Sequence, residues 1–169
     1  MGLESGNQEV LTRHKGRAFR DDNNEQAVHT QQRHGIHPHA SFIIGEPQET
    51  LDQMEETYRF IRRNPLSLTN IYVLTPLPGT PVWHDAKARG LVADDMDWDL
   101  LNISFELDWQ RVILVSQAVT REELHRMYQR LRRLRLYKYA RAIATHPFQM
   151  DLPEYGRAKA VEWAYRVRS

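Results

Sequence analysis

The stretch that decides the fold is His37-Pro38-His39-Ala40-Ser41-Phe42-Ile43-Ile44-Gly45. Its centre, residues 40–44, is short and almost wholly apolar, which is typical of a strand buried in a parallel sheet rather than of a surface helix. A second stretch of this kind, Ile71-Tyr72-Val73-Leu74, lies within residues 70–74 and is rich in β-branched and aromatic residues. Two such strands separated by a helical pattern predict a parallel α/β arrangement.

Sequence signals place helices before, between and after the two strands. The helix between them opens with Thr50-Leu51-Asp52-Gln53, which has the form of a capping box. The predicted segments are a short helix capped by Asn7 and reaching Leu11, a polar loop over 17–24, a helix from about 25 to 34, the helix that begins at Thr50 and stops at 64–65, and a helix from Thr80 to Gly90. Ligands of such folds bind at the carboxyl ends of the strands, so residues 45–50 and 75–81 are expected to line the site.

After residue 92 the chain is predicted to be irregular and then helical. An acidic loop is expected over 94–99, and a short edge strand over 112–115. A capping box at Thr120–Glu123 opens a long helix with a clear apolar stripe. Its opposite face carries the basic residues Arg126, Arg130, Arg132, Arg133 and Lys138. A last helix is expected from about 151 to 166.

Composition narrows the class of protein. The chain has 169 residues with 41% hydrophobic and 27% charged residues, which is typical of a globular domain. No apolar run is long enough for a membrane span, and no signal peptide is recognised at the start, so a cytoplasmic location is expected. There is no cysteine, which excludes disulfides and thiolate ligands on this chain.

Charge is distributed unevenly along the chain. Lys and Arg exceed Asp and Glu by 23 − 22 = 1 overall. Residues 1–120 hold 11 basic and 17 acidic side chains, net −6, whereas residues 121–169 hold 12 basic and 5 acidic side chains, net +7. This asymmetry predicts two faces or subdomains with different neighbours.

Three segments carry a family resemblance: Gly2-Leu3-Glu4-Ser5-Gly6 followed by Val10-Leu11, residues 41–50, and residues 74–81. In this order and spacing they resemble the second half of the radical S-adenosylmethionine (SAM) enzymes, in the branch that often carries a cobalamin-binding domain. The resemblance implies an α/β fold, with the chain supplying about strands 4–6 of a partial (β/α)6 TIM-like barrel and a mainly helical C-terminal extension. The implied domains are a partial barrel over 1–92, which forms the SAM-pocket half, and an extension over 93–169 with a basic helix at about 121–144.

The same resemblance implies roles for individual residues. For SAM binding these are Glu4 and Ser41 on the ribose, Ile43 against the adenine, Leu74 and Thr75 at the adenine edge through their backbone, and Lys15 on the carboxylate. Gly6, Gly45 and Glu49 are expected to be structural, with Gly45 allowing close backbone approach and Glu49 bonding nearby backbone amides. The residues alone favour simpler interpretations: Glu4 as an exposed carboxylate near a helix start, Ser41 as a small strand residue and Lys15 as a solvated lysine.

The family holds a 4Fe–4S cluster with a Cys-x3-Cys-x2-Cys motif, which this chain lacks. The expectation is therefore a fragment that supplies part of the SAM pocket and is inactive alone. The resemblance implies that the intact enzyme cleaves SAM reductively at the cluster to form a 5′-deoxyadenosyl radical that acts on an unknown small molecule, with cobalamin as a further cofactor of the branch. The chain would need the missing half or a partner chain, paired through an exposed strand edge.

Two alternatives stay open at this point. One is a SAM-binding or partner-dependent half-barrel module without radical chemistry. The other is a nucleic-acid-binding protein that uses the basic helix, which the sequence favours less because no aromatic-plus-basic stacking motif accompanies the helix. The histidines predict no metal site: His37 and His39 are close in sequence, but no further ligand completes a set, and His14 has no evident partner.

Overall fold

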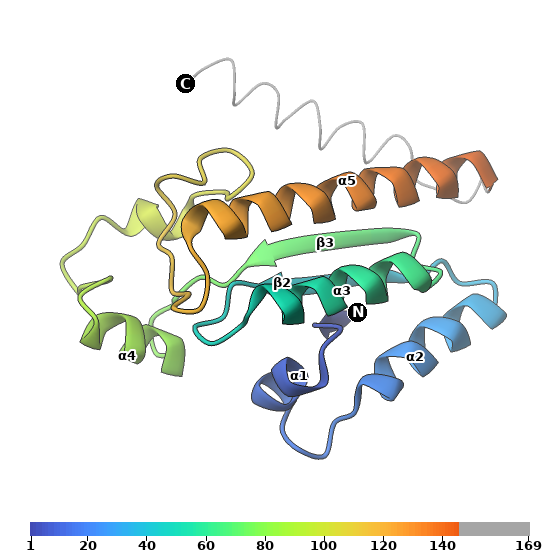
Figure 1. Cartoon of the computed structure of the whole chain (residues 1–169), viewed down its shortest axis with the longest axis horizontal. Helices are drawn as coiled ribbons and strands as arrows, with labels where there is room; N and C mark the ends of the chain where they lie inside the picture. Colours follow the sequence, from blue (N-terminus) through green and yellow to red (C-terminus); the bar gives the residue numbers. More distant parts are fainter. Residues whose placement is uncertain (146–169) are drawn as a thin grey trace.

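The computed structural model describes residues 1–145 and shows an α/β fold built on a three-stranded parallel sheet (Figure 1). The strands are β1 (Gly2–Glu4), β2 (His39–Ile44) and β3 (Leu68–Val73), in the order β1-β2-β3. Each residue of β2 pairs with one of β3 without a shift, so that Ile43 lies beside Tyr72. The predicted α/β class and the two predicted strands are confirmed.

The helices agree with the predicted order and differ in their limits. They are α1 (Gln8–Lys15), α2 (Asp21–Arg33), α3 (Leu51–Arg63), α4 (Pro81–Ala88), the 3-10 helix η1 (Trp98–Asn102) and α5 (Arg121–Thr145). The caps predicted at Asn7, Thr50 and Thr80 are present, and each accepts hydrogen bonds from backbone amides of the first turn. Thr120 and Glu123 bond to each other's backbone as a capping box predicts.

Two predicted segments are wrong. The polar loop expected over 17–24 is shorter than predicted, because α2 begins at Asp21. Asn24, in the first turn of α2, is buried and donates a hydrogen bond to the backbone oxygen of Leu3 at 2.9 Å. Residues 112–115 form no strand, because no strand of the described sheet pairs with them. Arginine side chains bond two of their carbonyls instead. Arg121 donates to Val112 O at 2.7 Å, and Arg89 donates to Val115 O at 2.8 Å.

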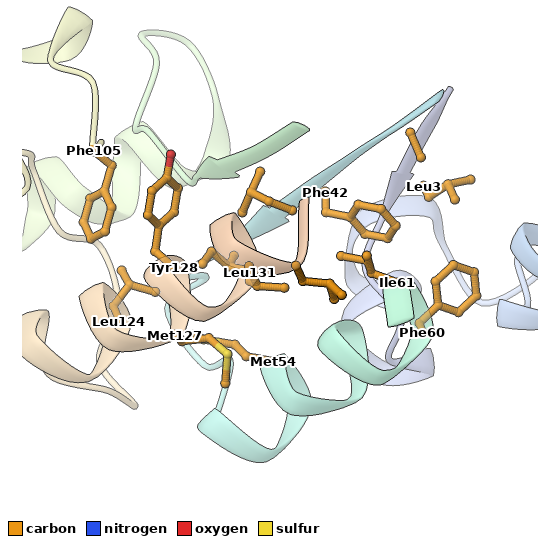
Figure 2. Close-up of a cluster of buried hydrophobic side chains, with 14 of the residues drawn as sticks. Leu3, Phe42, Met54, Phe60, Ile61, Phe105, Leu124, Met127, Tyr128 and Leu131 are labelled. Carbon is orange, nitrogen blue, oxygen red and sulfur yellow. The ribbon is translucent and has the colours of Figure 1, made fainter. Parts of the chain in front are cut away.

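One face of the sheet is covered by helices and holds the core (Figure 2). Along β2, Ala40, Phe42 and Ile44 are fully buried, whereas Ser41 and Ile43 are only partly buried. Strand residues alternate between faces, so the buried set points toward the helices. The same core contains side chains from α2, α3 and α5, namely Val28, Met54, Phe60, Ile61, Leu124, Met127, Tyr128, Leu131 and Leu134.

Helix α5 belongs to this core through its apolar stripe and lies against β3 and α3. The predicted boundary near residue 92 and the domains 1–92 and 93–169 stay predictions, as does the segment of a (β/α)6 barrel, because an open three-stranded sheet alone does not identify a barrel. The helix expected over 151–166 lies outside the described residues. Within residues 1–145, no helix combines the length and apolar character needed to cross a membrane.

Gly6, which lies between β1 and α1, packs directly against α3. A Cβ at this position would lie 2.5 Å from Phe60 Cβ and 2.9 Å from Thr57 Cα. Every residue has a Cα and every residue except glycine has a Cβ, so a smaller side chain at position 57 or 60 would not make room for a methyl group on Gly6. Gly6 is therefore required by packing.

We expect Gly6→Ala to lower the free energy of unfolding by about 1–3 kcal/mol, because the added methyl forces two backbone segments apart. Urea unfolding followed by circular dichroism measures this loss. Gly35→Ala is the control, since Gly35 has a φ of 73° but no atom within 4 Å of the added methyl, and only the backbone strain of about 1 kcal/mol should appear. A smaller loss for Gly6→Ala than for Gly35→Ala would contradict the packing argument.

Candidate functional site

The carboxyl ends of the three strands meet at one edge of the sheet, as parallel strands require. Glu4 ends β1, Gly45 follows β2, and Leu74 and Thr75 follow β3. Leu74 N donates to Ile44 O at 2.9 Å, which continues the pairing of β2 and β3 to this edge. The structure thus places four of the six residues expected to bind SAM at or next to this edge: Glu4, Ile43, Leu74 and Thr75. Ser41 lies further back on β2, where it pairs with Gly2 and Asn70.

The sheet face opposite the helices carries an accessible platform at this edge. Ile43 and Tyr72 are register partners on adjacent strands, so their side chains lie on the same face. Ile43 is partly buried and Tyr72 is 54% exposed. Tyr72 was missed by the sequence analysis, although the alternation of β3 around buried Ile71 would have placed it on this face.

A cavity of about 350 Å³ adjoins the platform at the outer edge of β3. Its lining includes Tyr72, Thr75 and Glu106, together with residues of the loop over 103–106. The platform therefore continues into a hollow of mixed polarity, which suits an amphipathic ligand.

Glu4 occupies a strained position. It has a φ of 67° and is the one non-glycine residue with positive φ in the part of the chain that the structure describes. Its carboxylate folds back toward Gly2, where it fills the space that a Cβ of Gly2 would occupy. Strained residues of this kind often occur at functional sites, and the conformation costs about 1–2 kcal/mol.

Next to Glu4, an ion cluster links α1 to the loop after β2. Glu46 is buried, accepts a hydrogen bond from Arg13 Nε at 2.9 Å and pairs with His14 Nε2. The hydrogen bond to Glu46 raises the pKa of His14, and this effect outweighs burial, which lowers it. The negative charge of Glu4 also raises the pKa of His14. Burial would raise the pKa of Glu46, but the bonds from His14 and Arg13 outweigh it and lower this pKa.

Sequence reasoning missed this cluster and left His14 without a partner. Glu46 lies more than thirty residues from Arg13 and His14 in the sequence, and no spacing rule connects them. Only the folding of α1 against the loop after β2 brings the three charges together.

Gly45 and Glu49 shape the loop that carries Glu46. Gly45 has a φ of 85°, and a Cβ there would lie 3.1 Å from Leu124 Cδ2, so the glycine lets α5 approach the loop. Glu49 is fully buried and accepts a hydrogen bond from Gly45 N at 2.7 Å, while its Oε1 has no partner among the described residues. Burial raises the pKa of Glu49 to about 7.

Lys15 lies apart from the strand ends. Its Nζ donates to Gly2 O at 2.6 Å and lies 4.5 Å from the centre of the Phe19 ring. These contacts tie the end of α1 to the start of β1. The role expected for Lys15 on a carboxylate of SAM stays a prediction.

The histidines near β2 have ordinary polar neighbours. His37 Nδ1 lies 3.3 Å from Ser67 Oγ, and His39 Nε2 lies 3.4 Å from Asn70 Nδ2. Over residues 1–145 no group of three or more His, Asp or Glu side chains is placed to hold a metal ion.

The buried carboxyl of Glu49 makes stability depend on pH. Between about pH 4.5 and pH 7 the folded protein holds a proton that the unfolded chain has lost, so this group makes stability fall as the pH rises through that range. We expect Glu49→Gln to remove this dependence, a difference of at most roughly 3 kcal/mol.

Urea unfolding of both proteins at a series of pH values measures the difference. Glu46→Gln serves as the control, because the lowered pKa of Glu46 has the opposite sign and its contribution is lost as the pH falls. A difference between wild type and Glu49→Gln that stays constant from pH 4.5 to 7 would contradict the assignment.

Three curated proteins are similar to this chain. An uncharacterized methyltransferase of Pyrococcus horikoshii is 33% identical over 97 residues, which is 57% of this chain and 21% of that protein. Two proteins of Chlorobaculum tepidum match as well: bacteriochlorophyllide d C-8(2)-methyltransferase, 24% identical over 102 residues, and bacteriochlorophyllide d C-12(1)-methyltransferase, 31% identical over 99 residues. These matches cover 60% and 59% of this chain and 22% and 21% of the respective relatives.

The chain spans about a fifth of the length of the curated relatives it matches. No family model matches it. The identification of the chain as the C-terminal half of a radical SAM enzyme is therefore wrong, because the similar proteins are methyltransferases by name and no family model supports the narrower identification. What the sequences show is similarity to part of several methyltransferases.

Proposed function

We propose that this chain forms part of the SAM-binding surface of a methyltransferase and that the open face of its sheet holds the adenosine of SAM. The observation that carries the proposal is the pair Ile43 and Tyr72, which lie side by side and accessible near the carboxyl edge of the parallel sheet. Such edges are where α/β folds bind nucleotides and related ligands. The methyltransferase relatives support a methyl donor as that ligand.

The residues present fit the parts of SAM. The side chain of Ile43 and the ring of Tyr72 offer an apolar surface for the adenine, and a base stacked on an aromatic ring contributes about 1–3 kcal/mol. Ser41 lies two residues before Ile43 on the same face, and its hydroxyl can bond a ribose hydroxyl. Glu4 supplies a carboxylate acceptor at the adjacent strand.

Leu74 and Thr75 contribute differently in this proposal. They follow β3 at the same edge, where backbone groups past the last strand residue bond the polar edge of the adenine. Thr75 also lines the adjoining cavity, into which part of the bound adenosine can extend. Lys15 keeps further N–H donors beyond its bond to Gly2, and we assign it to the carboxylate of SAM.

The chain's contribution is to bind and orient the methyl donor. The methyl acceptor, the transfer step and any further domain or partner belong to the whole protein and are part of the proposal, since the relatives are about five times longer than the matched segment. The edge strand β1 is the place where a neighbouring strand would extend the sheet, as in a barrel. A 4Fe–4S cluster does not fit this chain, which has no cysteine to hold it, and the names of the relatives do not mention cobalamin.

We expect the purified chain to bind radiolabelled SAM in equilibrium dialysis and Tyr72→Ala to weaken that binding about tenfold, which is the loss of one stacking contact. The matched control is Tyr137→Ala, which removes a tyrosine of similar exposure on α5: Tyr72 is 54% exposed and Tyr137 is 62% exposed. The proposal fails if wild type does not bind SAM or if both variants lose binding equally.

Glu4 gives a second test, because a substitution there should change stability and SAM binding in opposite directions. We expect Glu4→Gly to raise the free energy of unfolding by about 1 kcal/mol, since glycine adopts a positive φ without strain. The same change should weaken SAM binding through loss of the carboxylate. Chemical denaturation and dialysis measure the two effects, and a variant that is more stable and binds SAM as well as wild type would remove Glu4 from the site.

A further inference from the structure

A groove with strongly positive walls runs between α3 and α5, and no part of the proposed SAM site uses it. Two cavities of about 430 and 610 Å³ adjoin here and share Arg62, Lys138 and Arg141. The first also reaches the segments that precede β2 and β3, at residues 35–38 and 65–67. The groove therefore lies toward the amino ends of the strands, away from the carboxyl edge.

The charged lining is entirely cationic. The charged side chains of the two cavities are Arg62, Arg63, Arg130, Arg133, Lys138 and Arg141, and no Asp or Glu among the described residues lines either one. Arg63 pairs with Glu25 at 3.3 Å and Arg130 with Glu55 at 2.9 Å, outside the lining. No ion pair joins Arg62, Arg133 or Arg141 to any residue between 1 and 145.

Lys138 holds its charge at a partly buried position in the groove. Its Nζ is partly buried and donates to Asn64 O at 2.5 Å. Burial and the charge of nearby Arg141 lower the pKa of Lys138 to about 8. An anion in the groove would relieve this repulsion and favour the charged form of the lysine.

Aromatic side chains accompany the cations. Arg133, Tyr137 and Arg141 follow one another at four-residue intervals along α5, which places them in one row on the helix surface. Tyr137 is 62% exposed, so its ring is free to contact a ligand. Tyr58 lies across the groove on α3, with the guanidinium of Arg130 4.9 Å from its ring centre.

From these features we infer that the groove between α3 and α5 binds single-stranded nucleic acid, with its arginines and Lys138 on the phosphates and Tyr137 stacked on a base. Cationic grooves with interleaved aromatic rings are the general solution for binding single strands without sequence preference. From Arg130 to Arg141 the helix rises about 16.5 Å, enough for about five nucleotides of a stacked strand. A duplex would present phosphates to the groove but no free base face to Tyr137.

The test is fluorescence anisotropy of the full chain with fluorescein-labelled 12-nucleotide oligo(U) and oligo(dT), titrated at several salt concentrations. We expect both to bind, with affinity that falls as salt rises. Arg133→Ala/Arg141→Ala should weaken binding and make the slope of log K against log salt shallower by about 1.4, the loss of two phosphate contacts. The matched control is Arg17→Ala/Arg20→Ala, which removes the same charge from exposed positions outside the groove and should leave the slope unchanged.

Tyr137 separates stacking from charge. Tyr137→Ala should weaken oligonucleotide binding about tenfold without changing the salt slope, and Tyr137→Trp should retain it. Tyr72→Ala should leave oligonucleotide binding intact, and the groove variants should leave SAM binding intact, so this inference and the proposed function can fail independently. Circular dichroism of each variant confirms that it is folded.

Three results would overturn the inference. The first is no binding of either oligonucleotide at low salt. The second is an equal loss in Arg133→Ala/Arg141→Ala and in the control, which would indicate general attraction by net charge. The third is that the oligonucleotides do not bind, whereas tripolyphosphate or phosphatidylcholine vesicles containing phosphatidylserine bind and lose binding in Arg133→Ala/Arg141→Ala. This result would assign the groove to a small polyphosphate or to a membrane surface.

Discussion

The structure depends on the one-sided burial of β2. Ala40, Phe42 and Ile44 have no exposed surface, and they pack into one core with residues of α2, α3 and α5. Burying a large side chain such as Phe42 contributes about 1.5–3 kcal/mol, so the alternation of this strand determines which face the helices cover. Because right-handed connections place successive helices on the same side of a parallel sheet, the other face is left to Ser41, Ile43 and Tyr72.

The loop after β2 converts this asymmetry into a site. Gly45 lets α5 approach, and Glu49 holds the turn by accepting the amide of Gly45. This turn places the Glu46 carboxylate beside Arg13 and His14 of α1. A buried carboxylate that is paired with two basic groups keeps its charge, whereas the neighbouring Glu49, which is held by backbone amides, has a pKa of about 7. Two carboxyl groups three residues apart thus have opposite electrostatic roles because their partners differ.

The two surfaces discussed for ligands lie on different parts of the molecule. The platform of Ile43 and Tyr72 is near the carboxyl edge of the sheet, on the face without helices. The groove of Arg133, Tyr137 and Arg141 is on the helices and extends toward the amino ends of the strands. The helical layer separates them, so a ligand on one surface leaves the other accessible.

Local features were determined by the sequence alone. The two predicted strands, the caps at Asn7, Thr50, Thr80 and Thr120, and the helices they open depend on side-chain hydroxyls, amides and apolar spacing within a few residues, and all are present. The tertiary structure alone decided what depends on distant partners. Arginine side chains bond the carbonyls of Val112 and Val115, Asn24 of α2 bonds the backbone of β1, and Glu46 joins Arg13 and His14. It also placed Tyr58 beside Arg130. Such contacts depend on how helices and loops meet in space, and no periodicity within a single segment encodes them.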